Sequence, residues 1–164
     1  MTPAVRRASV GRQVGRVALV AAGVLVLDQV SKVIAVATLE GHEIDLTVVR
    51  LTVTRNSGAA FSLLRGQVWL FMAVAAGVTV IVLVALRRPQ STAMTLGLGM
   101  VLGGAWGNVI DRFARAPGAP RGGVVDFIDF KIWPVFNVAD AAIVVGAAVL
   151  VLFGGRRSTD ESSA

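Results

Sequence analysis

The stretch Gly99–Arg112, GMVLGGAWGNVIDR, begins as apolar membrane-span sequence and ends in a carboxylate and a cation. Its glycines Gly99, Gly103 and Gly107 are spaced four apart, and the next step of four reaches Asp111. On a helix these positions form one stripe, and small residues on a stripe let a second helix approach closely. We therefore expect the stripe to hold Asp111 against a neighbouring helix and away from lipid. A charged group in such a place is a candidate functional residue.

The composition of the whole chain is that of a membrane protein. The 164 residues are 55% hydrophobic and have a mean hydropathy of +0.73, which is too apolar for a soluble domain of this size. A helical span needs roughly 20 mostly apolar residues. The segments that meet or nearly meet this length are about 17–39, 68–86, 93–111 and 138–153. We predict an all-α membrane protein with one four-span domain over 17–153, a polar flank at 1–16 that is disordered at its start, and a polar tail at 154–164.

Charge and composition also exclude several classes of function. The net charge of +6 and the pI of about 11.4 would suit a nucleic-acid-binding protein. Membrane proteins, however, carry cationic flanks that set their topology, so we expect no nucleic-acid partner. The chain has no cysteine, which excludes disulfides and thiolate metal sites, and its single histidine argues against a histidine-based metal centre. We expect neither a metal nor a cofactor.

The first apolar segment carries a polar interruption. Residues 17–27 are wholly apolar and follow four arginines, a pattern that also fits a cleaved signal peptide. The run continues after a polar stretch that includes Asp28 and Lys32, which favours a retained span with one polar face. Asp28 and Lys32 are four residues apart with the acid first, the better order for a helical ion pair. We interpret them as a structural pair that binds neighbouring loops, in preference to a direct role in chemistry.

The connections between the spans contain strand-like sequence. Residues 46–56 are rich in β-branched side chains and predict a strand or one arm of a hairpin, and 124–130 predict another strand. Asn56-Ser57-Gly58 is typical of a turn, and its small residues suit equally a plain turn or a site where a substrate approaches the backbone. Residues 112–123 contain glycines and prolines, and we expect this loop to be a lid.

The topology follows from the number of spans and the position of the charges. Four spans place both termini on one side of the membrane. Arginine clusters next to spans, with few acids, lie on that side, which we assign to the cytoplasm. The loops 40–67 and 112–137 then face outward. Asp111 and Asp140 lie at the outer ends of the third and fourth spans.

Two carboxylates at one membrane depth suggest aspartyl hydrolysis. Close carboxylates share a proton, so that one activates water as a base and the other donates a proton as an acid. Asp140 lies near the N-terminal end of its helix, which favours the ionised base, and Asp111 lies near a C-terminal end, which favours the protonated acid. Asn108 and Asn137 precede the two aspartates by three residues and are placed to orient them. Arg112 is placed to bind a carbonyl or a phosphate headgroup.

Other functions remain open at this point. The same carboxylates also suit a structural pair, or a proton or ion site in a small transporter. Two features favour an enzyme. The carboxylates lie at one interface instead of crossing the bilayer as a relay would, and the two outer loops look structured enough to hold a substrate. Against transport, no inverted repeat is visible across the four spans.

Five motifs, in order, resemble those of the lipoprotein signal peptidases (signal peptidase II). They are DQVSK at 28–32, NSGAAF at 56–61, GGAWGNVIDR at 103–112, VVDFI at 124–128 and FNVAD at 136–140. The resemblance covers nearly the whole chain except its two ends. It implies a four-helix membrane bundle with a small extracytoplasmic β-sheet cradle, a mobile outer helix and cytoplasmic termini.

The resemblance also implies the activity. It implies an aspartic endopeptidase of the bacterial inner membrane, with its site near the outer face, that cleaves prolipoproteins before a cysteine bearing diacylglycerol. By motif, Asp111 and Asp140 are the catalytic pair. The supporting or substrate-binding residues are Asp28, Lys32, Asn56, Gly58, Asn108, Arg112, Asp126, Asn137 and Ala139. The expected partners are diacylglyceryl-modified prolipoproteins, membrane lipid and globomycin-type inhibitors, and we expect a monomer.

Overall fold

Four helices and a small sheet make up the computed structural model, which describes residues 3–56, 68–115 and 123–154. The helices are α1 (Pro3–Leu39), α2 (Val68–Ala85), α3 (Thr92–Ala114) and α4 (Val138–Gly154), and the strands are β1 (Glu43–Leu46), β2 (Val49–Asn56) and β3 (Val124–Asp129). Within the described ranges, three helices (α1, α2 and α3) are long and apolar enough to cross a membrane, and α4 is a shorter apolar helix. The predicted helix bundle with a small sheet is confirmed.

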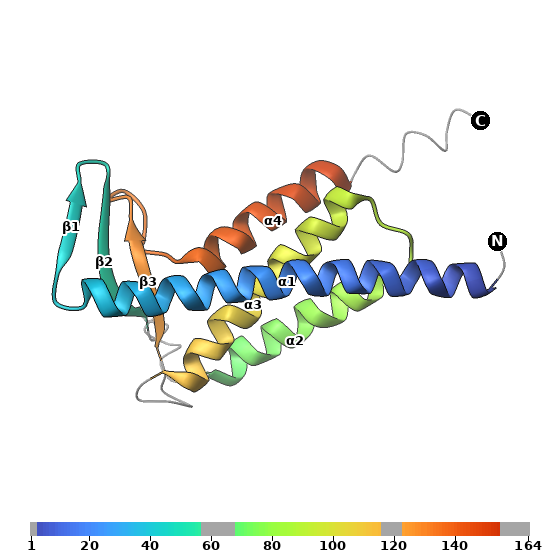
Figure 1. Ribbon diagram of the computed structural model, residues 1–164, viewed down its shortest axis with the longest axis horizontal. Coiled ribbons are helices and arrows are strands. Elements are labelled where there is room, and N and C mark those ends of the chain that lie inside the picture. The colour runs from blue at the N-terminus through green and yellow to red at the C-terminus, as the bar shows by residue number, and fades with distance from the viewer. Residues whose placement is uncertain (1–2, 57–67, 116–122, 155–164) are drawn as a thin grey trace.

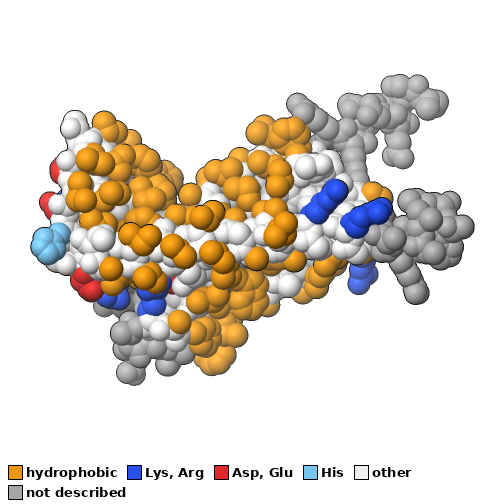
Figure 2. All heavy atoms as spheres, in the orientation of Figure 1, with side chains coloured by type: hydrophobic (Ala, Val, Ile, Leu, Met, Phe, Trp, Pro, Cys, Tyr) orange, Lys and Arg blue, Asp and Glu red, His pale blue; other side chains and the backbone are white. Residues whose placement is uncertain are grey.

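Helix α3 lies at the centre of the bundle and packs against the other three helices. Helix α1 begins and α4 ends at the same end of the bundle, and the sheet lies at the opposite end (Figure 1). The strands form an antiparallel sheet in the order β1-β2-β3. On the face shown in Figure 2, hydrophobic side chains cover the helices, and acidic side chains appear only at the sheet end. This arrangement suits a bundle embedded in lipid with its sheet in a polar environment.

The glycines of α3 permit two close helix contacts. A Cβ at Gly103 would lie 2.6 Å from the Ala21 carbonyl oxygen of α1, and one at Gly104 would collide with the Ala139 carbonyl oxygen of α4. Gly99 and Gly107, on the same stripe as Gly103, also face α1. The prediction that this stripe holds a neighbouring helix is therefore confirmed, and α3 uses the adjacent glycine to contact α4.

Two elements differ from the sequence-based expectation. The expected flank at 1–16 is helical from Pro3 onward and continues into the span, so that α1 has 37 residues. The arginines of this segment have good helix propensity, but the segment has no apolar periodicity. A helix was therefore not predicted there. The strand predicted over 46–56 is β2 of a hairpin, which pairs with the four-residue β1 through a turn at Thr47, where φ is 67°.

We predict that Gly104→Ala destabilises the bundle by about 1–3 kcal/mol, because the new methyl group must displace the backbone of α4. Gly77→Ala on α2 is the matched control. A Cβ there meets nothing within 4 Å, so the better helix propensity of alanine should leave stability unchanged or raise it. Thermal unfolding in detergent micelles measures both, and equal stability of the two variants would contradict the packing argument.

Candidate active site

A buried lysine joins two acids from different helices at the sheet end of the bundle. The Lys32 Nζ lies 2.8 Å from Asp28 Oδ2 and 2.9 Å from Asp111 Oδ2, and all three side chains are fully buried. The predicted pairing of Asp28 with Lys32 is confirmed. The pair is not isolated, because Lys32 also binds Asp111 of α3. A buried ion needs such partners to offset its loss of hydration.

The carboxylate of Asp111 is bound on both oxygens. Its Oδ1 accepts from Gln29 Nε2 at 2.9 Å and from Arg115 Nε at 2.9 Å. Its Oδ2 accepts from the Val125 backbone N–H at 3.0 Å and contacts Lys32. Asp28, Lys32, Asp111 and Arg115, which we call the ion cluster, carry two negative and two positive charges. As ions they balance one another.

A second group of acids surrounds two asparagines. Asn108 Nδ2 donates to Asp140 Oδ1 at 2.7 Å, and Asn137 Nδ2 donates to Asp126 Oδ1 at 2.6 Å. Asn137 Nδ2 also donates to Asn108 Oδ1 at 3.2 Å. Asn56 Nδ2 donates to the other oxygen of Asp126 at 3.1 Å. Asp126 and Asp140, which we call the acid pair, are thus held by one amide network.

The start of α4 fixes the position of Asp140. Helix α4 begins at Val138, so Asn137 is its N-cap and Asp140 its third residue. The Asp140 N–H donates to Asn137 Oδ1 at 3.0 Å, and the Asn137 N–H donates to Asp140 Oδ2 at 3.3 Å. This reciprocal capping box satisfies backbone donors that would otherwise be unpaired. The sequence spacing of Asn137 and Asp140 therefore serves both the helix and the site.

The acid pair is electrostatically coupled. Asp126 is 2% exposed, and its burial, followed by the negative charge of Asp140, raises its pKa from 3.8 to about 6. Hydrogen bonds from Asn56 and Asn137 lower the pKa of Asp126 by less. Arg112 interacts through its charge with Asp126, Asp111 and Asp140. The acid pair therefore has a cation beside it that also faces the ion cluster.

The structure brings the predicted site residues together with one exception. Gly58 lies outside the described residues, as do residues 116–122 of the loop expected to be a lid. The start of that expected loop, residues 112–114, is instead the last turn of α3. Ala139 contributes to the site through its backbone N–H, which donates to Asp28 Oδ1 at 2.9 Å. Asp111 and Asp140 belong to different groups of contacts, the ion cluster and the acid pair.

Sequence reasoning missed two members of the site, Gln29 and Arg115. Gln29 Nε2 reaches Asp28 at 3.0 Å as well as Asp111. Arg115 follows Asp111 by four residues, with the acid first, which is the favoured order for a helical ion pair. That spacing could have identified Arg115 as a partner of Asp111 from the sequence. Gln29 lies within the DQVSK motif, but its bond to Asp111 depends on the contact between α1 and α3, which spacing along one helix does not reveal.

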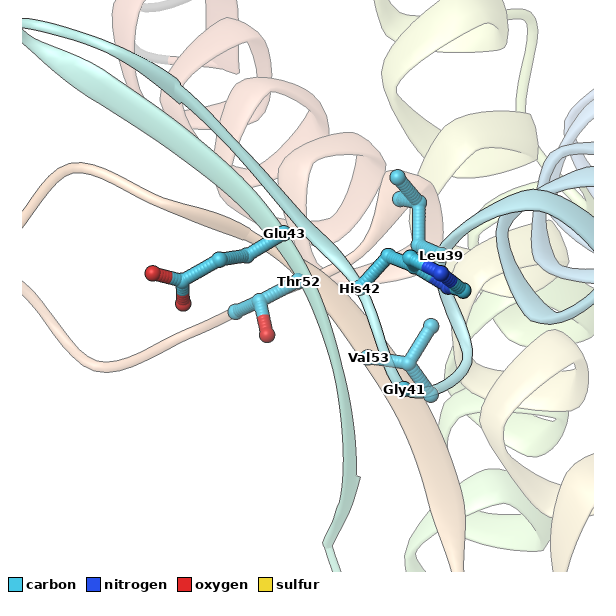
Figure 3. Close-up of a pocket in the computed structure, with 6 residues that line it drawn as sticks. All are labelled: Leu39, Gly41, His42, Glu43, Thr52 and Val53. Atoms are coloured by element: carbon cyan, nitrogen blue, oxygen red, sulfur yellow. The ribbon is translucent and has the colours of Figure 1, made fainter.

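Among the described residues, two hollows near the sheet end differ in their lining. One, of about 360 Å³, has Asp140 in its wall, and its remaining lining is apolar: Phe130, Trp133, Phe136, Ala141, Val144 and Val145. The other, of about 350 Å³, lies between the end of α1 and the β1–β2 hairpin. Figure 3 shows that the His42 and Glu43 side chains at this second hollow extend in opposite directions. Only the first hollow therefore combines an apolar wall with an acid of the pair.

This fold and site are those of a membrane-embedded enzyme. The family model of signal peptidase (SPase) II matches residues 20–154. The chain is 50% identical over 136 residues to the lipoprotein signal peptidase of Mycobacterium leprae, covering 81% of this chain and 68% of that protein. The corresponding protein of Mycobacterium avium is 47% identical over 156 residues, which are 87% of this chain and 86% of that one.

A solved structure described as a bacterial membrane enzyme has the same fold. Its TM-score is 0.74 at 27% identity, with 88% of this chain and 95% of that chain covered. The chain therefore belongs to the signal peptidase II family. It is an enzyme of the family that removes signal peptides from prolipoproteins.

We predict that Asp111→Asn destabilises the protein by about 3–5 kcal/mol, because it leaves Lys32 and Arg115 with too little negative charge in a buried site. Asp45→Asn is the matched control, since it removes the acid of an exposed ion pair with Lys131, and exposed pairs contribute little. Unfolding in detergent measures both. If Asp111→Asn were as stable as the control, the ion cluster would not have the structural role we assign to it.

Proposed function

We propose that this chain is an aspartic endopeptidase that cleaves diacylglyceryl-modified prolipoproteins directly before the lipidated cysteine, at the outer face of the bacterial inner membrane. The observation that carries the proposal is the acid pair, two coupled carboxylates held by one amide network. The apolar hollow beside Asp140 supports a lipid-modified substrate, because acyl chains stay in the bilayer while the scissile bond meets the acids. Globomycin-type inhibitors are expected to occupy the same site, and we expect the chain to act as a monomer.

We assign the catalytic pair to Asp126 and Asp140. Sequence analysis predicts Asp111 as the partner of Asp140, and the contacts favour Asp126 instead. Both oxygens of Asp111 accept hydrogen bonds, and two of its partners are cations. Because both oxygens already have protein donors, neither is free to take a proton from water or to contact a substrate. Asp126 has a raised pKa and an acidic neighbour, as a shared-proton pair requires.

The positions of the two acids suggest their roles. Asp140 lies in the first turn of α4, where the helix dipole favours the carboxylate, so we assign it as the base. Asp126, with its raised pKa, is assigned as the acid. Asp140 takes a proton from water as the water oxygen attacks the scissile carbonyl carbon, and Asp126 gives its proton to the carbonyl oxygen. The tetrahedral intermediate then collapses and the C–N bond breaks as the proton on Asp140 passes to the leaving amine of the cysteine. One hydroxyl proton of the intermediate returns to Asp126 as the carbonyl of the product acid forms, which restores the starting state of both acids.

The first test is cleavage of a diacylglyceryl-modified prolipoprotein by purified wild type and by three variants in detergent or lipid. Asp126→Asn and Asp140→Asn should each lower kcat by at least about 10³-fold while remaining folded, because each removes one proton-transfer group. Asp111→Asn should lose stability first and keep measurable turnover at temperatures where it is folded. An unlipidated substrate and a chelator serve as controls. Turnover by Asp126→Asn near that of wild type, with Asp111→Asn folded and inactive, would restore Asp111 to the pair.

The second test is the pH dependence of cleavage. An acid with a pKa of about 6 is protonated below that value and loses its proton above it. We therefore predict that kcat/KM falls as pH rises through about 6. The corresponding fall in kcat should occur at higher pH, because bound substrate excludes water and raises the pKa of Asp126 further. Asp129→Asn is the control, since Asp129 pairs with Arg50 on the sheet, and it should leave the limb in place. A profile that is flat between pH 5 and 8 would contradict the assignment.

A further inference from the structure

Helix α2 contributes an aromatic ring to the site. The guanidinium carbon of Arg112 lies 3.6 Å from the centre of the Phe71 ring, and Arg112 is 7% exposed. A cation at this distance over the face of a ring is attracted by the negative charge of that face. Phe71 belongs to none of the motifs that define the site in the sequence. Its contact with Arg112 is nevertheless the link between α2 and the residues that surround the acid pair.

Most of the hydrogen-bonding capacity of Arg112 is unused. A guanidinium has five N–H donors. In the part of the chain that the structure describes, one of them is engaged, from Nη1 to the Asn108 carbonyl oxygen at 2.9 Å. The described residues contain no buried side-chain nitrogen or oxygen without a partner, so the Nε and Nη2 atoms of Arg112, which have none among these residues, reach the surface. These donors are available to a ligand.

A stacked arginine differs from a salt-bridged one. A bidentate pair with Asp126 or Asp140 would consume the donors of Arg112 and fix the acid as a carboxylate. A ring packed against the flat face of the guanidinium holds its plane and leaves the N–H edge open. Phe71 thus offsets part of the cost of burying Arg112 without using a hydrogen bond.

We propose that Phe71 is a positioning residue that holds Arg112 for the scissile carbonyl oxygen of the substrate. This inference rests on the proposed function. Arg112 Nη1 donates to the carbonyl oxygen of Asn108, and the side chain of Asn108 holds Asp140 at 2.7 Å, so the guanidinium lies beside the acid pair. The carbonyl oxygen gains negative charge as water attacks, and a fixed cationic donor binds that charge more strongly than it binds the substrate carbonyl. The contact between Arg112 and this oxygen is therefore expected to raise kcat.

The test compares aromatic and aliphatic residues at position 71. Phe71→Leu should lower kcat about 10-fold with KM unchanged within about 2-fold, because it loses the ring face that orients the cation. Phe71→Tyr should retain nearly full activity, since it keeps that face. Leu70→Ala, on the same helix and 43% exposed, is the control for a change in α2 and should match wild type. Thermal unfolding of each variant in detergent accompanies the kinetics.

A second measurement keeps the ring shape constant. Replacement of Phe71 by 3,5-difluorophenylalanine weakens the negative face of the ring with little change in volume, and should lower kcat about 3-fold. Equal kcat in wild type, Phe71→Leu and the fluorinated protein would overturn the inference, as would a loss confined to KM or an equal loss in Phe71→Tyr and Phe71→Leu. If wild type itself fails to cleave the lipidated substrate, the proposed function fails instead, and the two failures are thereby distinguished.

Discussion

The buried ammonium of Lys32 is the constraint on which the rest of the site depends. Its position at 2.8 Å from Asp28 and 2.9 Å from Asp111 holds α1 against α3, and neither acid can withdraw without leaving a charge unpaired in a nonpolar interior. The glycines of α3 are required by the same contact, because a larger side chain at Gly107 would press on the Asp28 carboxylate, 2.8 Å from where a Cβ would stand. The small residues and the charges of the sequence therefore act together.

The ion cluster also positions the acid pair, and it does so through the backbone. Asp111 accepts from the N–H of Val125, the residue directly before Asp126. Asp28 accepts from the N–H of Ala139, the residue directly before Asp140. Each acid of the pair thus follows a peptide group that is bound by the cluster. This explains how carboxylates on a strand and on a helix keep a fixed separation, although neither element touches the other over most of its length.

Some of this arrangement could be predicted from the sequence. Apolar length gave the four helices, and the spacing of Gly99, Gly103 and Gly107 gave the face of α3 that meets a neighbour. The choice between Asp111 and Asp126 as the partner of Asp140 could not be made in this way. Spacing tells which residues of one helix share a face, whereas the environment of Asp126 depends on the register between β2 and β3, which is irregular between Leu51 and Thr54. Likewise, whether an acid is neutralised depends on cations that reach it from other elements, as Lys32 reaches Asp111.

The cations near the four acids bear on the proposed mechanism, in which the acid pair holds one proton. Lys32 and Arg115 contact Asp28 and Asp111, and as ions the four side chains balance one another. Arg112 is a further cation of the site, and it interacts through its charge with Asp126, Asp111 and Asp140. Two carboxylates with one cation, in a buried place, are most stable when they retain a single proton. This balance of charges supports the proposed mechanism, in which the acid pair holds its proton before substrate arrives. Because Arg112 stacks on Phe71 instead of forming an ion pair with one acid, it leaves the two acids of the pair to interact with each other.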